Sequence, residues 1–178
     1  MGFGLITIGL ALLMGVEVGF GLVGYPLMFA GFRRLTRIDD DFLICGVLAL
    51  LNIPYSAVCL LELLGVVGTD SVIAGCLTVA NYVFSAVMYG IFFQKIRRIA
   101  IDGGSAPLER ESTGCLLMFG LYYVFSLAAV FIPVIRSTLL VGVLTVFRYL
   151  LIAFGILLLL NCGAKITTAE VIEWEMKK

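Results

Sequence analysis

Two charged side chains lie near the middle of long apolar runs of this chain, and their type and position make them the first candidates for chemistry. Glu17 lies near the middle of the run 3–32, and Arg148 lies near the middle of the run 138–161. A charged side chain at the centre of a bilayer costs roughly 2.5–3.5 kcal/mol on insertion scales, so it normally faces the interior of a helical bundle and finds a partner. Because the two charges are opposite and lie at similar depths, we predict that Glu17 and Arg148 pair directly or through water.

Three uncharged or acidic residues extend this polar layer. Asn52 and Asn81 fall at nearly the same level of the runs 42–67 and 72–93. Glu62 follows Asn52 at a helical distance of about 15 Å, so we expect it to line a vestibule at the outer end, together with Asp70. The predicted substrate-binding residues are therefore Glu17, Arg148, Asn52, Asn81 and Glu62.

The charged pair has two interpretations. Buried ion pairs in helical bundles can simply fix the order and register of the helices, which is a structural role. In the functional interpretation, the layer binds a small polar or charged solute, or Glu17 exchanges a proton in a proton-coupled cycle. Solute sites of membrane transporters lie near the bilayer midplane, where this layer is predicted.

The apolar runs that position these residues dominate the composition. Hydrophobic residues make up 62% of the 178 residues and charged residues 13%, with a mean hydropathy of +1.14, which excludes a soluble globular protein. One membrane crossing needs roughly 20 apolar residues. The runs lie at about 3–32, 42–67, 72–93, 114–135 and 138–161. They predict an all-α integral membrane protein, with five transmembrane helices in a domain over 1–163 and a short cytoplasmic tail helix over 164–178.

The basic residues predict the orientation. Ten of the twelve Lys and Arg residues gather in three clusters: Arg33, Arg34 and Arg37; Lys95, Arg97, Arg98 and Arg110; Lys165, Lys177 and Lys178. The opposite ends of the runs carry only Arg136. Cytoplasmic loops retain an excess of Lys and Arg, so five crossings put the N-terminus outside and the C-terminus in the cytoplasm. We expect the plasma (inner) membrane as the location.

Glycines suggest where other helices approach. Gly21 and Gly24 follow Glu17 on its own helical face, and Gly15 and Gly19 form a GxxxG on another face. Small residues allow close packing of transmembrane helices. Besides the lipid bilayer, we therefore expect another membrane protein or a second copy of the chain as partner, through these glycine-rich faces, and no nucleic acid.

Several kinds of chemistry are not expected. The chain contains no histidine, which removes the commonest general base and most zinc and copper sites. It has no G-x-S-x-G nucleophile elbow and no acidic cluster spaced for a divalent metal. We expect no cofactor, no metal and no enzymatic activity. The sequence favours a transporter or transport-complex subunit with a polar site at the bilayer midplane; the alternative is a non-catalytic subunit or scaffold of a larger membrane complex.

Overall fold

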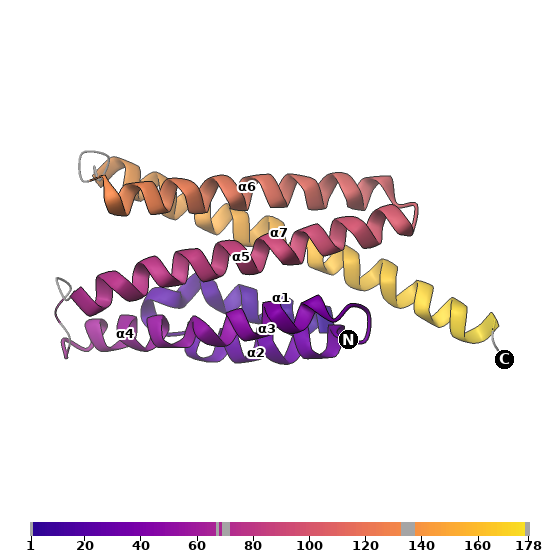
Figure 1. Cartoon of the computed structure of the whole chain (residues 1–178), viewed down its shortest axis with the longest axis horizontal. Helices are drawn as coiled ribbons and strands as arrows, with labels where there is room; N and C mark the ends of the chain where they lie inside the picture. The colour runs from indigo at the N-terminus through magenta and orange to yellow at the C-terminus, as the bar shows by residue number, and fades with distance from the viewer. Residues whose placement is uncertain (1, 67, 69–71, 133–137, 177–178) are drawn as a thin grey trace.

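The chain folds into helices joined by short turns. The computed structural model describes residues 2–66, 68, 72–132 and 138–176, and the side chains of all of these except 138, 139 and 166–176. No strand occurs in these ranges, so the all-helical prediction is confirmed. The elements are α1 (Gly2–Leu12), the 3-10 helix η1 (Leu13–Val18), α2 (Gly21–Leu35), α3 (Asp41–Leu51), α4 (Ile53–Leu63), α5 (Val72–Asp102), α6 (Ala106–Phe131) and α7 (Thr138–Met176), as Figure 1 shows.

Four segments of the described chain are long and apolar enough to cross a membrane. They are α3 with α4 (Asp41–Leu63), α5, α6 and the part Leu140–Lys165 of α7. α3 and α4 form one rod interrupted at Asn52, where Pro54 in the first turn of α4 lacks the N–H that a continuous helix would use. This is the architecture of a polytopic integral membrane protein.

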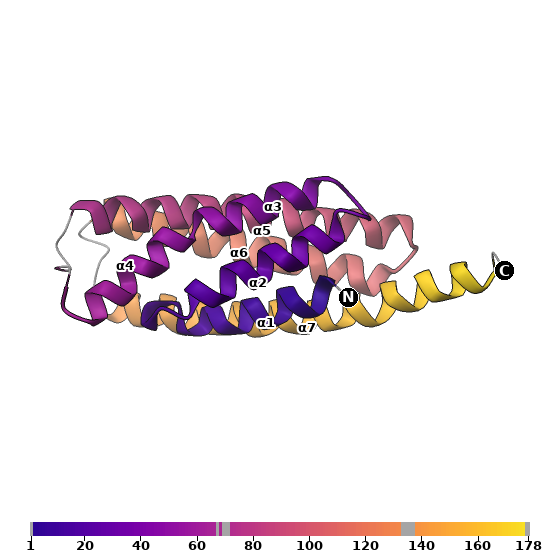
Figure 2. The same ribbon diagram turned by 90° about the horizontal axis from the view of Figure 1, so that it is seen from below.

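The prediction that the run 3–32 is a single span is wrong. α1 and η1 continue to Val18, the chain turns at Gly19, and α2 returns beside α1 (Figure 2). Gly19 has a φ of 85°, a left-handed conformation that favours glycine. A single helix of 30 residues would also be about 45 Å long, well beyond a hydrocarbon core of about 30 Å.

Glycines hold this hairpin together by letting the two backbones touch. A Cβ atom on Gly9 would lie 2.7 Å from the carbonyl oxygen of Gly24, and one on Gly31 would lie 2.8 Å from that of Gly2. Three glycines of the faces predicted to bind a partner make other contacts. Gly24 packs against Gly9, Gly21 lies against Ser56 of α4, and Gly19 makes the turn. These glycines are used within the chain.

Both ends of the described chain lie at the same end of the bundle. Gly2 packs against Leu35 at the end of α2, and Phe3 lies against Gly163 of α7. The turn between α5 and α6 also lies at this end (Figures 1 and 2), where Ser105 accepts a hydrogen bond from Lys165. The hairpin adds one reversal of the chain and so puts these segments at one end of the bundle, which differs from the predicted arrangement; the orientation across a membrane stays a prediction. We call the end of the bundle that holds Gly2, Leu35, Ser105 and Lys165 the basic end, and the opposite end the far end.

The C-terminal tail and the segment between α5 and α6 are largely helical. The tail helix expected over 164–178 is the continuation of α7, which runs unbroken to Met176. Between α5 and α6 only residues 103–105 leave the helices, with Gly104 at a φ of 66°.

Buried aromatic rings fill the bundle near the basic end. Phe32 of α2 and Phe42 of α3 both meet Phe92 of α5 edge to face, with ring centroids 5.2 and 6.0 Å apart. Phe93 continues this layer to Phe119 of α6 at 5.0 Å. All but Phe119 are at most 1% exposed, so this aromatic layer closes the bundle on that side.

The glycine contacts of the hairpin give a first prediction. Gly24→Ala would place a methyl group 2.9 Å from the carbonyl oxygen of Gly9, so we expect a loss of about 1–3 kcal/mol in the free energy of unfolding, typical of overpacking. Gly4→Ala in the same hairpin is the control, because nothing described lies within 4 Å of its Cβ position. Thermal unfolding in detergent measures both. Equal melting temperatures for the two variants would contradict the tight α1–α2 contact.

The positions of the termini give a second prediction. Fusions of green fluorescent protein and of alkaline phosphatase, placed separately at each terminus and in the α5–α6 turn, report the side of the membrane. We expect the same side for all three sites, because Gly2, Leu35 and Gly163 lie at one level of the bundle. Opposite sides for the two termini would restore the five-span topology.

Candidate functional site

The tip of the hairpin brings the two charged residues together. Arg148 Nη1 donates a hydrogen bond to Oε1 of Glu17 at 2.9 Å, so the predicted pairing is confirmed and is direct. The partners differ in burial: 17% of the Arg148 side chain is exposed, against 59% for Glu17. Glu17 thus lies at the tip of the hairpin, and its predicted place at the centre of a spanning helix is wrong because the chain reverses at Gly19.

Part of the Arg148 guanidinium group makes no hydrogen bond with the described residues. Nε and Nη2 are buried and have no hydrogen-bond partner among the described residues. A buried donor without a partner typically costs about 1–3 kcal/mol, and more when the group is charged. The ring of Tyr149, 5.3 Å from the guanidinium carbon, supplies only a cation–π contact. The edge of Arg148 formed by Nε and Nη2 is therefore buried without a hydrogen bond to the described residues.

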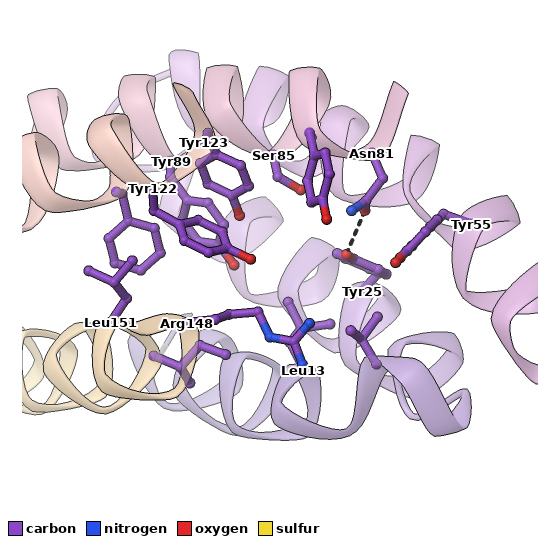
Figure 3. A pocket seen from close by; sticks show the side chains of 14 residues that line it. Leu13, Tyr25, Tyr55, Asn81, Ser85, Tyr89, Tyr122, Tyr123, Arg148 and Leu151 are labelled. Carbon is purple, nitrogen blue, oxygen red and sulfur yellow. Dashed lines mark hydrogen bonds between the residues drawn. The ribbon is translucent and has the colours of Figure 1, made fainter. Parts of the chain in front are cut away.

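Tyrosines surround a small inner cavity next to this edge. The cavity holds about 40 Å³, enough for a few waters or one small polar group. Six of the seven tyrosines of the chain line it: Tyr25, Tyr55, Tyr82, Tyr89, Tyr122 and Tyr123. Figure 3 shows the hydroxyls of Tyr25, Tyr55 and Tyr122 directed into the space above Arg148. Tyr25 donates a buried hydrogen bond of 3.0 Å to Oδ1 of Asn81.

A larger outer cavity opens above the tip of the hairpin. It holds about 590 Å³ and shares Arg148, Tyr82 and Tyr122 with the inner cavity. The hairpin stops before the far end of α4 (Figure 2), and the described residues that line the cavity beyond Glu17 come from α4, α5, α6 and α7. Small side chains widen the space on three helices: Ala74, Gly75 and Thr78 of α5, Ser126 and Ala129 of α6, and Thr145 of α7.

The predicted site residues separate into three groups. Glu17, Glu62 and Arg148 line the outer cavity, and Asn81 lines the inner one. Asn52 is not among the residues that line either cavity; it is fully buried at the break between α3 and α4 and donates to the carbonyl oxygen of Leu48 at 3.1 Å. The structure therefore does not bring Asn52 to the surface of either cavity, in contrast to its predicted place among the substrate-binding residues. Asp70, expected in the vestibule, lies outside the described residues.

The tyrosines were not among the site residues predicted from the sequence. A signal was present in their spacing: Tyr82, Ser85 and Tyr89 recur at i, i+3 and i+7 on α5, beginning beside Asn81. This spacing puts three hydroxyls on one helical face. A face of hydroxyls inside an apolar span indicates a polar cavity.

The arrangement can bind and orient a polar solute. Arg148 and six tyrosines line the inner cavity, and Glu17 and Glu62 line the wider cavity above it. No group of three His, Cys, Asp or Glu side chains that could hold a metal ion occurs within the described part of the chain. The donors favour an oxyanion near Arg148, and the carboxylates favour a cation beside it.

Comparisons with known proteins identify no relative. No family model, no curated protein and no solved structure matches this chain. A function can therefore be inferred only from the two cavities and from Arg148, whose guanidinium group makes one hydrogen bond and leaves Nε and Nη2 without a partner among the described residues.

Proposed function

We propose that this chain is a membrane transporter, or the solute-binding subunit of a transport complex, whose binding site is Arg148 at the floor of the outer cavity. One observation carries the proposal: a cavity of about 590 Å³ ends at a buried arginine whose Nε and Nη2 have no partner among the described residues. The role involves binding and no covalent chemistry.

The depth of Arg148 supports a transport site. Arg148 lies ten residues from the start of α7 at Thr138, which is about 15 Å along the helix axis and close to half of a hydrocarbon core of about 30 Å. Solute sites of secondary transporters lie near this midplane. We propose that the basic end faces the cytoplasm of a cell bounded by the plasma (inner) membrane, because Lys and Arg accumulate there, so that the cavity opens outward.

The aromatic layer at the basic end would form the closed gate of this conformation. Phe32 of the hairpin meets Phe92 of α5 at 5.2 Å, and the same hairpin carries Glu17 at its tip. A solute that binds between Glu17 and Arg148 would therefore act on the element that also seals the opposite side. Movement of the hairpin against α5 is our proposed route to the inward-open state.

The asymmetry of the Glu17–Arg148 pair predicts how its variants behave. Glu17→Ala leaves the largely buried Arg148 without its partner, so we expect a loss of about 1–3 kcal/mol in the free energy of unfolding. Arg148→Met removes the buried charge and leaves a mostly exposed carboxylate, so its melting temperature should equal or exceed that of the wild type. Thermal unfolding in detergent, with Arg110→Met as the control at the basic end, measures both. A strongly destabilised Arg148→Met protein would favour the structural role of the pair.

Solute binding is the direct test of the proposed function. The purified protein is heated in the presence of a panel of amino acids, sugars, carboxylates, amines and nucleosides at millimolar concentration. We expect one class to raise the melting temperature of the wild type and of Arg110→Met but not of Arg148→Met, because binding stabilises the folded state by mass action. If the whole panel leaves the wild type unchanged, the scaffold alternative gains and the transport proposal fails.

A further inference from the structure

We infer that a groove between α3 and α5 at the basic end binds an anionic phospholipid, with its phosphate on Arg98 and one acyl chain along the two helices. This groove is separate from both cavities described above and does not depend on the proposed function. Three features carry the inference: the position of the groove at the ends of two membrane spans, its positive charge, and the apolar surface that continues from it.

The groove lies where two spans leave the apolar part of the membrane. It has a volume of about 310 Å³, and its described lining residues are Asp41 and Ile44 of α3 and Ile91, Gln94, Lys95 and Arg98 of α5. Gln94 directly follows the apolar run 72–93, and Asp41 directly precedes the apolar run 42–67. Because the hydrocarbon core ends where the apolar runs end, the groove lies at the level of the lipid head groups.

The charges of the groove favour an anion. Lys95 Nζ lies 2.8 Å from Oδ2 of Asp39 and also pairs with Asp41, so one ammonium group holds both carboxylates. Arg98 forms no ion pair within the described part of the chain. The charged side chains that line the groove are Asp41, Lys95 and Arg98, which give it a formal charge of +1. A ligand with one negative charge would neutralise the groove.

The donors of the groove suit a phosphate group. The guanidinium group of an arginine presents parallel N–H donors that bind two oxygens of a phosphate in a bidentate manner. Gln94 and Arg98 are four residues apart on α5, so they lie one turn apart on the same face, and both are exposed. The amide of Gln94 can therefore donate to a phosphate that Arg98 holds. Basic pockets between membrane-spanning helices bind the head groups of anionic lipids in this way.

An apolar surface continues from the groove toward the middle of the bundle. Exposed apolar side chains recur at helical spacing on both helices: Ile44, Val47 and Leu51 of α3, and Val83 and Val87 of α5. From Ile44 to Leu51 this surface extends about 10 Å along the helix axis. An acyl chain attached to the phosphate can lie along it, whereas a free phosphate ion cannot use it. The surface and the groove together therefore fit a phospholipid.

The test compares three compounds that share parts of the proposed ligand. Native mass spectrometry of the purified protein in detergent measures the Kd of dioleoyl phosphatidylglycerol, dioleoyl phosphatidylcholine and glycerol 3-phosphate. The second compound has the same acyl chains, but its choline cation cancels the phosphate charge; the third has the phosphate and no acyl chain. We expect phosphatidylglycerol to bind at least about tenfold more tightly than either of the others.

Two variants of neighbouring arginines assign the contact. Arg98→Gln removes the guanidinium group from the groove, so the Kd of phosphatidylglycerol should rise by about tenfold or more, while that of phosphatidylcholine changes less. Arg97→Gln is the matched control, because it removes the same charge one residue away. Arg97 does not line the groove, and its Nε lies 4.0 Å from Oε1 of Glu109 of α6, so this variant should bind phosphatidylglycerol as the wild type does.

The melting temperature without lipid separates binding from folding. Arg98 is exposed and forms no ion pair within the described residues, so Arg98→Gln should unfold at the temperature of the wild type. A loss of lipid binding by this variant then reports the groove itself. If Arg98→Gln is destabilised, the comparison of the three compounds on the wild type still decides the class of ligand.

Each other outcome overturns a stated part of the inference. An equal loss of binding in Arg98→Gln and Arg97→Gln would indicate a general attraction of anions to the basic end and would overturn the groove. Equal Kd values for the two lipids would overturn the preference for an anionic head group. Glycerol 3-phosphate binding as tightly as phosphatidylglycerol would overturn the acyl-chain contact. These results leave the transport proposal unaffected, because the solute panel tests it separately.

Discussion

The backbone contact between α1 and α2 is the constraint on which the rest of the structure depends. Gly9 against Gly24 and Gly2 against Gly31 let two helices of the first apolar run lie side by side, and Gly19 makes the reversal that this requires. Because the hairpin uses half of the run in each direction, its tip ends inside the bundle. That one fact puts Glu17 beside Arg148, leaves the outer cavity unfilled and brings the described N-terminal end to the basic end.

The site that results is polar on one side and strongly apolar on the other. Tyrosines suit this boundary, because the ring packs against apolar neighbours while the hydroxyl reaches the cavity. Tyr89 illustrates this: it lines the inner cavity and its ring contacts Phe119 at 4.7 Å and Phe93 at 6.0 Å, within the aromatic layer. The same side chain thus belongs to both the inner cavity and the aromatic layer, so in our proposal a solute in the cavity would act on the closed end of the bundle.

The sequence predicted the helical membrane architecture and the charged pair. It predicted mid-depth for Glu17 from a single long helix, whereas Glu17 lies at the tip of a hairpin. Residue 17 lies halfway along the run, so it falls at mid-depth either at the centre of one long helix or at the tip of a hairpin. Hydropathy cannot distinguish these cases; the excess length of the run and the spacing of Gly9, Gly24 and Gly31 could have done so. Asn52 was wrongly assigned to the binding residues because the sequence does not distinguish an asparagine buried at a helix break from one that lines a polar site. The tyrosines were missed because an amphipathic residue fits lipid contact and a cavity equally well.

The asymmetry of the charged pair is the strongest reason to prefer binding over a purely structural role. An ion pair that only fixes helix order is best when both partners are equally buried and every donor is used. Here Arg148 is largely buried with two free donors, while most of the Glu17 side chain is exposed to the cavity. A bundle under selection for stability alone would gain from an apolar residue at this position. In our proposal, binding of a solute at Arg148 offsets the cost of retaining this residue, and the short hairpin leaves the cavity through which the solute arrives.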